Sequence, residues 1–192
     1  PRFFELALSK SDDSAPDPIN IKTDRGDINI YGIIDRVDLY KKDGDVYIRV
    51  VDYKTGSKEF SLENVSMGLD MQMLLYLFSI WKNGHSPRSA LKIPDNAEIV
   101  PAGILYFKAG VPTVTLENET EPQAVLGMVS DKLSRRGLLL EDENVLRAMD
   151  TELSGKYLPV KIKKDGTLSG AASLTSLEGF KTLLSSIEDT VG

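Results

Sequence analysis

The fold is decided by residues 32–54, whose sequence is GIIDRVDLYKKDGDVYIRVVDYK. Runs rich in β-branched residues flank the polar segment KKDGD at 41–45. Such runs around a short Gly-containing turn are typical of a β-hairpin. We therefore predict one strand within residues 19–40 and its partner over residues 46–54.

The predicted hairpin carries charged residues at the ends of its apolar runs. Because side chains alternate between the two faces of a strand, Asp52 and Lys54 should share a face while Tyr53 points away. Asp35 lies on the partner strand and can face the same way if the register places it opposite. Charges in such positions are costly to bury unless something binds them.

A hard divalent cation would bind this group. Mg²⁺ prefers oxygen ligands in an octahedron and usually takes one or two protein carboxylates, which Asp35 and Asp52 would supply. The backbone carbonyl of Tyr53 could add a third oxygen. Lys54 would then lie near a metal-bound water and stabilise charge that develops on phosphorus. The pattern predicts a phosphodiester-hydrolysing site, although Asp-x-Lys by itself is more often a solvated ion pair.

Helices and further strands are predicted on both sides of the hairpin. Apolar residues at helical spacing predict helices over residues 62–81, 122–136, 141–153 and 176–188. Strands are predicted for FFELAL at 3–8, for a second hairpin over 98–108 and 112–116, and for a short segment over 158–163, with loops over 9–18 and 83–96.

The composition excludes several classes of protein. The 192 residues carry a net charge of −6, one His and no Cys, so disulfides, zinc-thiolate sites and multi-His metal centres within the chain are excluded. The acidic balance argues against a basic nucleic-acid glove but not against a metal-dependent nuclease, which concentrates carboxylates at its site. No apolar run reaches the roughly 18 residues that span a membrane, so we expect a cytoplasmic protein.

Three segments together form a longer pattern: GIIDRVD at 32–38, VDYKTG at 51–56 and QMLLY at 72–76. They resemble the motifs G-x-I-D-R-x-D, D-Y-K-T/S-G and Q-x-x-x-Y of RecB-like nuclease domains in the PD-(D/E)xK nuclease superfamily. The segments GLLLEDENVLRAMD at 137–150 and LPVKIKKDG at 158–166 are similar to the C-terminal nuclease domain of AddB, the second component of bacterial AddAB helicase–nucleases.

The resemblance implies an α/β (α+β) fold with a restriction-endonuclease-like central mixed β-sheet flanked by helices. It also implies that Asp35 and Asp52 bind the catalytic Mg²⁺, for which Mn²⁺ could substitute, and that Lys54 is the catalytic lysine. Gln72 and Tyr76 would lie on one helix face and position the scissile strand or the metal ligands. A core Tyr with a partner Gln is the structural alternative for that pair.

Other residues of these motifs are expected to be structural or to depart from the family pattern. Arg36 alternates with Asp35 along the strand, so we expect it to form an ion pair with Asp38 rather than to act in catalysis. Family members often have a His or Glu metal ligand before the first motif, and Glu5 is the early candidate here. AddB-type domains also hold a [4Fe-4S] cluster, whose Cys ligands are absent from this sequence.

The implied function is that of a metal-dependent DNA exonuclease in a helicase–nuclease complex that processes double-strand breaks for recombinational repair. It would cut single-stranded DNA fed by an AddA-like helicase–nuclease subunit, and the chain has no GxxxxGK[ST] motor motif of its own. We expect one domain over 1–192, cut from a longer polypeptide, with an edge strand and loop over 1–18, a catalytic core over 19–116 and a helical part over 117–192. The alternatives are a non-catalytic structural or DNA-guiding module with a nuclease fold, and a stand-alone Cas4-like exonuclease.

Overall fold

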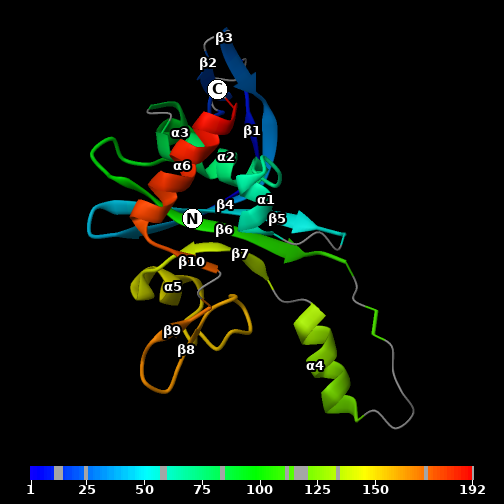
Figure 1. The fold of residues 1–192 in the computed structure, drawn as a ribbon. Coiled ribbons are helices and arrows are strands. Elements are labelled where there is room, and N and C mark those ends of the chain that lie inside the picture. Colours follow the sequence, from blue (N-terminus) through cyan, green and yellow to red (C-terminus); the bar gives the residue numbers. More distant parts are fainter. Residues whose placement is uncertain are drawn as a thin grey trace.

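A mixed β-sheet forms the centre of the molecule (Figure 1). The computed structural model describes residues 1–10, 15–23, 26–56, 60–82, 85–110, 113–114, 121–132, 135–170 and 173–191. Six strands make up the central sheet, in the order β1 (Arg2–Leu8), β4 (Gly32–Lys42), β5 (Asp45–Lys54), β6 (Ile99–Lys108), β7 (Arg136–Leu140) and β10 (Leu174–Thr175). The pairs β5–β6 and β7–β10 are parallel and the other pairs are antiparallel. This confirms the mixed sheet and the predicted edge strand at FFELAL.

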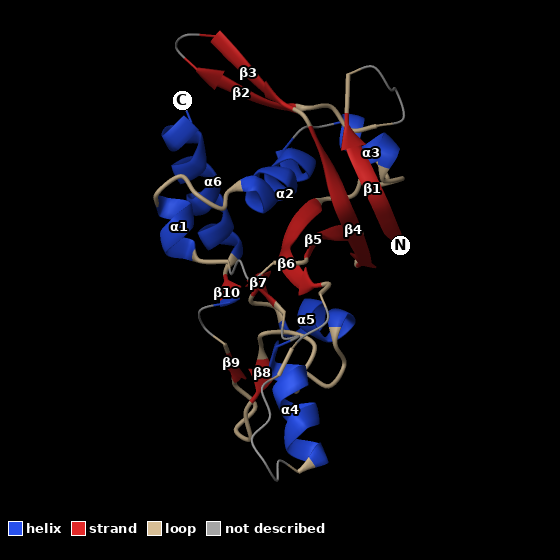
Figure 2. Cartoon of the chain, turned by 90° about the vertical axis from the view of Figure 1, so that its right-hand side faces the viewer, coloured by secondary structure: helices blue, strands red, loops and turns tan. Residues whose placement is uncertain are grey.

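Helices and two small sheets surround this centre. The helices are α1 (Leu62–Ser66), α2 (Gln72–Lys82), α3 (His85–Ala90), α4 (Pro122–Lys132), α5 (Glu143–Met149) and α6 (Leu177–Val191). The small sheets pair β2 (Ile19–Thr23) with β3 (Gly26–Ile30), and β8 (Lys161–Ile162) with β9 (Leu168–Ser169). Helices α1, α2 and α6 lie on one side of the central sheet, and α5 with β8 and β9 lies on the other (Figures 1 and 2). Among the described residues, no helix combines the length and the apolar character that crossing a membrane requires.

Strand β5 contributes to the apolar core on each side of the sheet. Val50 packs into the core beneath α2, whereas the next residue, Val51, packs into the core with Leu146 of α5. Both valines are fully buried, and burial of such a side chain stabilises the fold by about 1.5–3 kcal/mol. The two cores therefore fix the strand that ends in the Asp-Tyr-Lys segment.

The predicted central hairpin is confirmed. Strands β4 and β5 pair antiparallel from Arg36 opposite Val51 to Lys42 opposite Asp45. The two residues between them, Asp43 and Gly44, have φ angles of 53° and 93°. Positive φ at both central positions is the requirement of a type I′ turn, which Asp-Gly satisfies. This turn and the buried faces together set the register of the strands.

The single helix predicted over 62–81 is wrong, because the segment forms two helices. Between α1 and α2 the backbone takes positive φ at Gly68 (77°) and at Asp70 (56°), and no α-helix continues through such angles. Leu69, which fits the apolar repeat, is 56% exposed in this break. The break lets α2 begin at Gln72. Residues 83–96, predicted as a loop, include the short helix α3.

The second predicted hairpin also differs from the structure. The first strand is confirmed as β6, but its neighbours are β5 and β7. Thr113 and Val114 lie outside any strand, and the other residues of 112–116 lie outside the described part of the chain. The helix predicted over 122–136 ends as α4 at Lys132, and Arg136 already begins β7. Three consecutive leucines in β7 have high helix propensity, but burial within the sheet outweighs it.

The remaining C-terminal elements agree with the sequence, with shifted ends. Helix α5 begins after Asp142, whose carboxylate accepts a hydrogen bond from Val145 N and so caps the helix. The strand predicted over 158–163 shortens to β8, and the terminal helix is confirmed as α6.

Candidate active site

Asp35 and the Asp52–Tyr53 peptide meet at the end of the central hairpin. The register that pairs Arg36 with Val51 places Asp35 opposite Asp52 at the next position. The Tyr53 N–H donates a 2.9 Å hydrogen bond to Asp35 Oδ2. The Asp35 carboxylate therefore lies against the β5 backbone at Tyr53, the residue between Asp52 and Lys54.

Asp52 and Lys54 share a face of β5, as their alternation predicts. Lys54 Nζ lies 2.8 Å from Asp52 Oδ2, with the two side chains 34% and 13% exposed. The Lys54 ammonium is the charge partner of this buried oxygen, which has no further hydrogen-bond donor among the described residues. An ionised carboxylate has about four acceptor positions, so one with a single charge partner can still bind a ligand.

The oxygens at this point fit a hard divalent cation. The N–H and C=O of one strand residue point toward the same neighbouring strand, so the Tyr53 carbonyl faces the edge where its N–H meets Asp35. Asp35, Asp52 and this carbonyl provide the oxygen donors that Mg²⁺ prefers. The described residues contain no group of three or more His, Cys, Asp or Glu suited to a metal. A site here would thus use two carboxylates and leave its other positions to water and phosphate.

Tyr106 of β6 belongs to the same neighbourhood, although the sequence did not single it out. It is the register partner of Asp52 across the parallel β5–β6 pair, and its ring centroid lies 5.9 Å from Lys54 Nζ. Burial, and then the negative charges of Asp52 and Asp70, raise the pKa of Tyr106 above its ordinary value. Its phenol therefore stays protonated and neutral. The sequence predicted the strand, but the parallel register that brings Tyr106 beside Asp52 has no local signal.

Gln72 and Tyr76 form a hydrogen-bonded pair on α2. Gln72 Nε2 donates to the Tyr76 hydroxyl at 3.0 Å, with Gln72 exposed and Tyr76 buried. The Tyr76 hydroxyl lies over Gly32 of β4, where a Cβ atom would approach it to 2.2 Å. This contact explains the glycine that opens the first motif. Gly32 precedes Asp35 by three strand residues, about 10 Å.

Glu5 lies in β1 at an interruption of the β1–β4 pairing. Phe4 pairs with Arg36 and Leu6 pairs with Ile34, which puts Glu5 at the position facing Asp35. Glu5 is exposed and has a φ of 51°, an unusual backbone conformation for a residue other than glycine.

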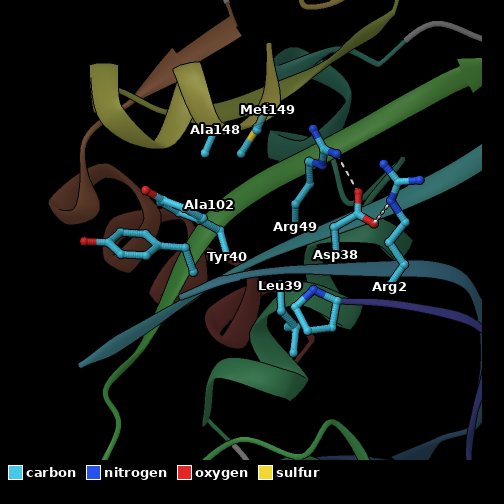
Figure 3. A pocket seen from close by; sticks show the side chains of 10 residues that line it. Arg2, Asp38, Leu39, Tyr40, Arg49, Ala102, Ala148 and Met149 are labelled. Atoms are coloured by element: carbon cyan, nitrogen blue, oxygen red, sulfur yellow. Dashed lines mark hydrogen bonds and ion pairs between the residues drawn. The ribbon is translucent and has the colours of Figure 1, made fainter. Parts of the chain in front are cut away.

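A second charged cluster on the hairpin consists of Asp38 and the two arginines that donate hydrogen bonds to it. Arg36 donates from Nε and Nη2 to the two carboxylate oxygens of Asp38, each at 2.8 Å, and Arg49 donates to Oδ2 as well. Burial alone would raise the pKa of Asp38, but these hydrogen bonds bring it below its ordinary value. The predicted Arg36–Asp38 ion pair is confirmed. Asp38 and Arg49 line a cavity of about 480 Å³ (Figure 3), which does not include Asp35, Asp52 or Lys54.

Comparison with known proteins agrees with the motifs. A profile of the PD-(D/E)XK nuclease superfamily matches residues 2–168. The B subunits of the ATP-dependent helicase/deoxyribonucleases of Clostridium acetobutylicum and Clostridium kluyveri are 34% and 36% identical over all of this chain, which covers 16% of each of them. The Acetivibrio thermocellus protein of the same name is 35% identical over 86% of this chain and 14% of its own length. The chain thus spans about one sixth of these relatives, and it belongs to the PD-(D/E)XK nuclease superfamily.

Proposed function

We propose that this chain is a metal-dependent deoxyribonuclease domain that hydrolyses phosphodiester bonds of single-stranded DNA. The observation that carries the proposal is that the register places Asp35 opposite Asp52, while Lys54 Nζ lies 2.8 Å from Asp52 Oδ2 on the same strand face. Two carboxylates and a lysine in this arrangement would supply ligands for a divalent cation and a positive group for phosphate charge.

Each site residue has a distinct role in this proposal. Asp35, Asp52 and the Tyr53 carbonyl hold Mg²⁺, or Mn²⁺ in its place, and the bound cation would activate water and neutralise phosphate charge. Lys54 is exposed enough to contact both a water and a phosphate, so it orients the nucleophile and stabilises negative charge on the phosphoryl oxygens.

The residues beyond this centre position it. Gln72 is exposed above Tyr76 and can contact the scissile strand through its amide, while Tyr76 anchors α2 against β4 at Gly32. Glu5 occupies the register position that faces Asp35, but it forms no group of three metal-binding acids with Asp35 and Asp52, so the proposed site uses the two aspartates. The chain has no Cys, so it supplies no thiolate to the [4Fe-4S] cluster implied by the resemblance, and no step here involves that group.

The names of the relatives guide the wider proposal. They are subunits of an ATP-dependent helicase/deoxyribonuclease. We therefore propose that this domain acts beside an AddA-like helicase–nuclease subunit, which feeds it single-stranded DNA during recombinational repair of double-strand breaks in the cytoplasm. The 192 residues would form one domain of the larger polypeptide.

The test is a cleavage assay on end-labelled single-stranded DNA, with Mg²⁺ and with EDTA. We expect metal-dependent cleavage that falls by at least about 100-fold in Lys54→Ala, because charge stabilisation at the phosphoryl oxygens is lost. Lys41→Ala is the matched control, since Lys41 is an exposed lysine at the other end of the same hairpin. Equal cleavage by the parent and Lys54→Ala would contradict the assignment.

A calorimetric titration with Mn²⁺ separates this proposal from its main alternative. The parent should bind the ion at millimolar concentration, and Asp52→Ala should bind it more weakly. If the parent neither binds Mn²⁺ nor cleaves DNA, the chain is a non-catalytic module that retains the nuclease fold.

A further inference from the structure

Aromatic and cationic side chains alternate across the sheet on the side of α5, β8 and β9. We call Phe4, Arg36, Phe107, Arg135 and Tyr157 the cation–aromatic row. The Arg36 guanidinium carbon lies 5.8 Å from the ring centroids of both Phe4 and Phe107. The Arg135 guanidinium carbon lies 4.1 Å from the Phe107 centroid and 5.4 Å from that of Tyr157. The row is therefore continuous from β1 to the segment that precedes β8.

Tyr53 connects this row to the candidate active site. Its ring packs edge-on against Phe107 with centroids 5.6 Å apart, and its hydroxyl accepts a 3.1 Å hydrogen bond from Arg36 Nη1. Its N–H donates to the Asp35 carboxylate. One residue thus has its backbone in the candidate site and its side chain beside the row.

The rings at both ends of the row are open to solvent, although Arg36 between them is buried. Phe4 is 60% exposed, Tyr53 39% and Tyr157 44%, whereas Arg36 is 8% exposed. Solvated arginines usually extend away from a surface, but Arg36 is held between rings by its bonds to Asp38. This arrangement holds exposed aromatic faces in fixed positions, as proteins that stack unpaired bases do.

A basic pocket adjoins the row at Arg135. It is a cavity of about 390 Å³, and the described residues that line it include Arg135, Arg136, Lys161, Ser154, Ser169 and Ser173 and no acidic residue. The sequence around it has the same bias, because residues 153–164 contain four lysines and no Asp or Glu, in a chain of net charge −6. Arginine, lysine and serine side chains are the usual donors to phosphate oxygens.

We propose that the cation–aromatic row and the basic pocket together form a track for single-stranded DNA, with bases on the exposed rings and backbone phosphates in the pocket. This inference rests on the proposed nuclease function, since the strand would pass from the row, on the Tyr53 face of the sheet, to Asp52 and Lys54 on the other face. A single strand is the occupant because bases paired in a duplex are stacked on one another and do not present their faces to protein rings. The pocket without acidic residues complements the charged backbone.

The experiment measures binding without catalysis. Fluorescence anisotropy in EDTA compares oligothymidine of about 16 nucleotides, the upper range for one single-strand-binding fold, with an abasic strand of equal length. The variants are Tyr157→Ala for the row, Lys161→Ala for the pocket and Lys41→Ala as a control outside both. Tyr157→Phe keeps the ring and should bind like the parent. Circular dichroism checks that each variant is folded.

The two parts of the track predict different losses. Tyr157→Ala should weaken oligothymidine binding by about fivefold or more, leave the salt dependence unchanged and remove the preference over the abasic strand. Lys161→Ala should weaken binding of both strands equally and reduce the slope of log affinity against log salt by about 0.7, the value for one phosphate contact.

Other outcomes overturn the track. The track is wrong if the parent binds duplex as tightly as oligothymidine or binds no DNA. It is also wrong if both Ala variants bind like the parent, or if Lys41→Ala loses as much affinity as they do. The result is independent of the proposed nuclease chemistry. If Lys54→Ala abolishes cleavage while the track variants bind normally, only the track is wrong. If the track variants lose binding and the parent cuts no DNA, the nuclease proposal is wrong and the track stands.

Discussion

Asp38 and Asp52 lie on the same hairpin, next to cations, and their side chains are equally buried, each 13% exposed. Their hydrogen bonding differs. Both oxygens of Asp38 accept hydrogen bonds from Arg36, and Arg49 adds another, whereas the buried Oδ2 of Asp52 has no donor besides its charge partner Lys54 among the described residues. The half-exposed Lys54 beside Asp52 is also far less constrained than the two arginines. Two equally buried acids on one hairpin thus differ in their partners: two buried arginines hold Asp38, whereas Oδ2 of Asp52 lies beside the more exposed Lys54.

The largest expected effect is on cleavage in Asp52→Asn. The substitution removes a charge that would bind the metal, so we expect the single-turnover cleavage rate to fall by about 1000-fold. The free energy of unfolding in urea should fall by less than in Asp38→Asn, because Asp52 loses an ion pair with the 34% exposed Lys54, whereas Asp38 loses ion pairs with two buried arginines. A variant that cuts DNA normally, or that loses its fold, would remove the contrast with Asp38.

The reverse pattern is expected for Asp38→Asn. Two buried guanidinium groups lose their counter-charge, and breaking such a cluster costs about 3 kcal/mol. Urea unfolding should show this loss, while the folded fraction of the variant should retain cleavage activity. The comparison fails if Asp38→Asn is as stable as the parent, or if its correctly folded fraction is inactive.

A smaller effect is expected where α2 meets the hairpin. In Gly32→Ala the new methyl group would overlap the Tyr76 hydroxyl. We expect this overpacking to lower the free energy of unfolding by about 2 kcal/mol. Tyr76→Phe removes the hydroxyl and should restore part of the stability in the double variant. Urea unfolding of the four proteins forms a double-mutant cycle. Additive losses would mean that the two residues do not interact as the structure places them.

The sequence predicted features that depend on local chemistry. The Asp-Gly turn and the alternation of Asp52, Tyr53 and Lys54 follow from backbone preferences and the pleat of a strand, and the structure agrees with them. The Gln72–Tyr76 pair follows from helical spacing. The sequence also identified Asp35, but its hydrogen bond from the Tyr53 N–H depends on the side chain's position at the strand end.

Features that depend on distant partners were missed. Strand β7 was not predicted, because its leucines favour either state until Gly103 and the rest of β6 lie beside them. The break after α1 has positive φ at Asp70, and Asn64 donates to the Asp70 carboxylate, which only the folded segment shows. Tyr106 enters the site, and Phe107 enters the row, through the parallel β5–β6 pairing. A period-two pattern predicts the faces of a strand but not its neighbours.

The smallest expected effect concerns how steeply the free energy of unfolding falls at low pH. Burial would raise the pKa of Asp38, but hydrogen bonds from Arg36 and Arg49 make it lower than its ordinary value. A carboxyl whose pKa is lower in the folded than in the unfolded state stabilises the fold fully above its unfolded pKa, about 3.9. This stabilisation is lost as pH falls through the folded pKa. Asp38→Asn should therefore flatten the fall in unfolding free energy below about pH 4. Some slope should persist, since a side-chain hydrogen bond from Thr167 also lowers the pKa of the exposed Asp165 in both proteins. Urea titrations across that range test this, and parallel acid limbs in the parent and the variant would show that the arginine cluster does not hold Asp38 ionised.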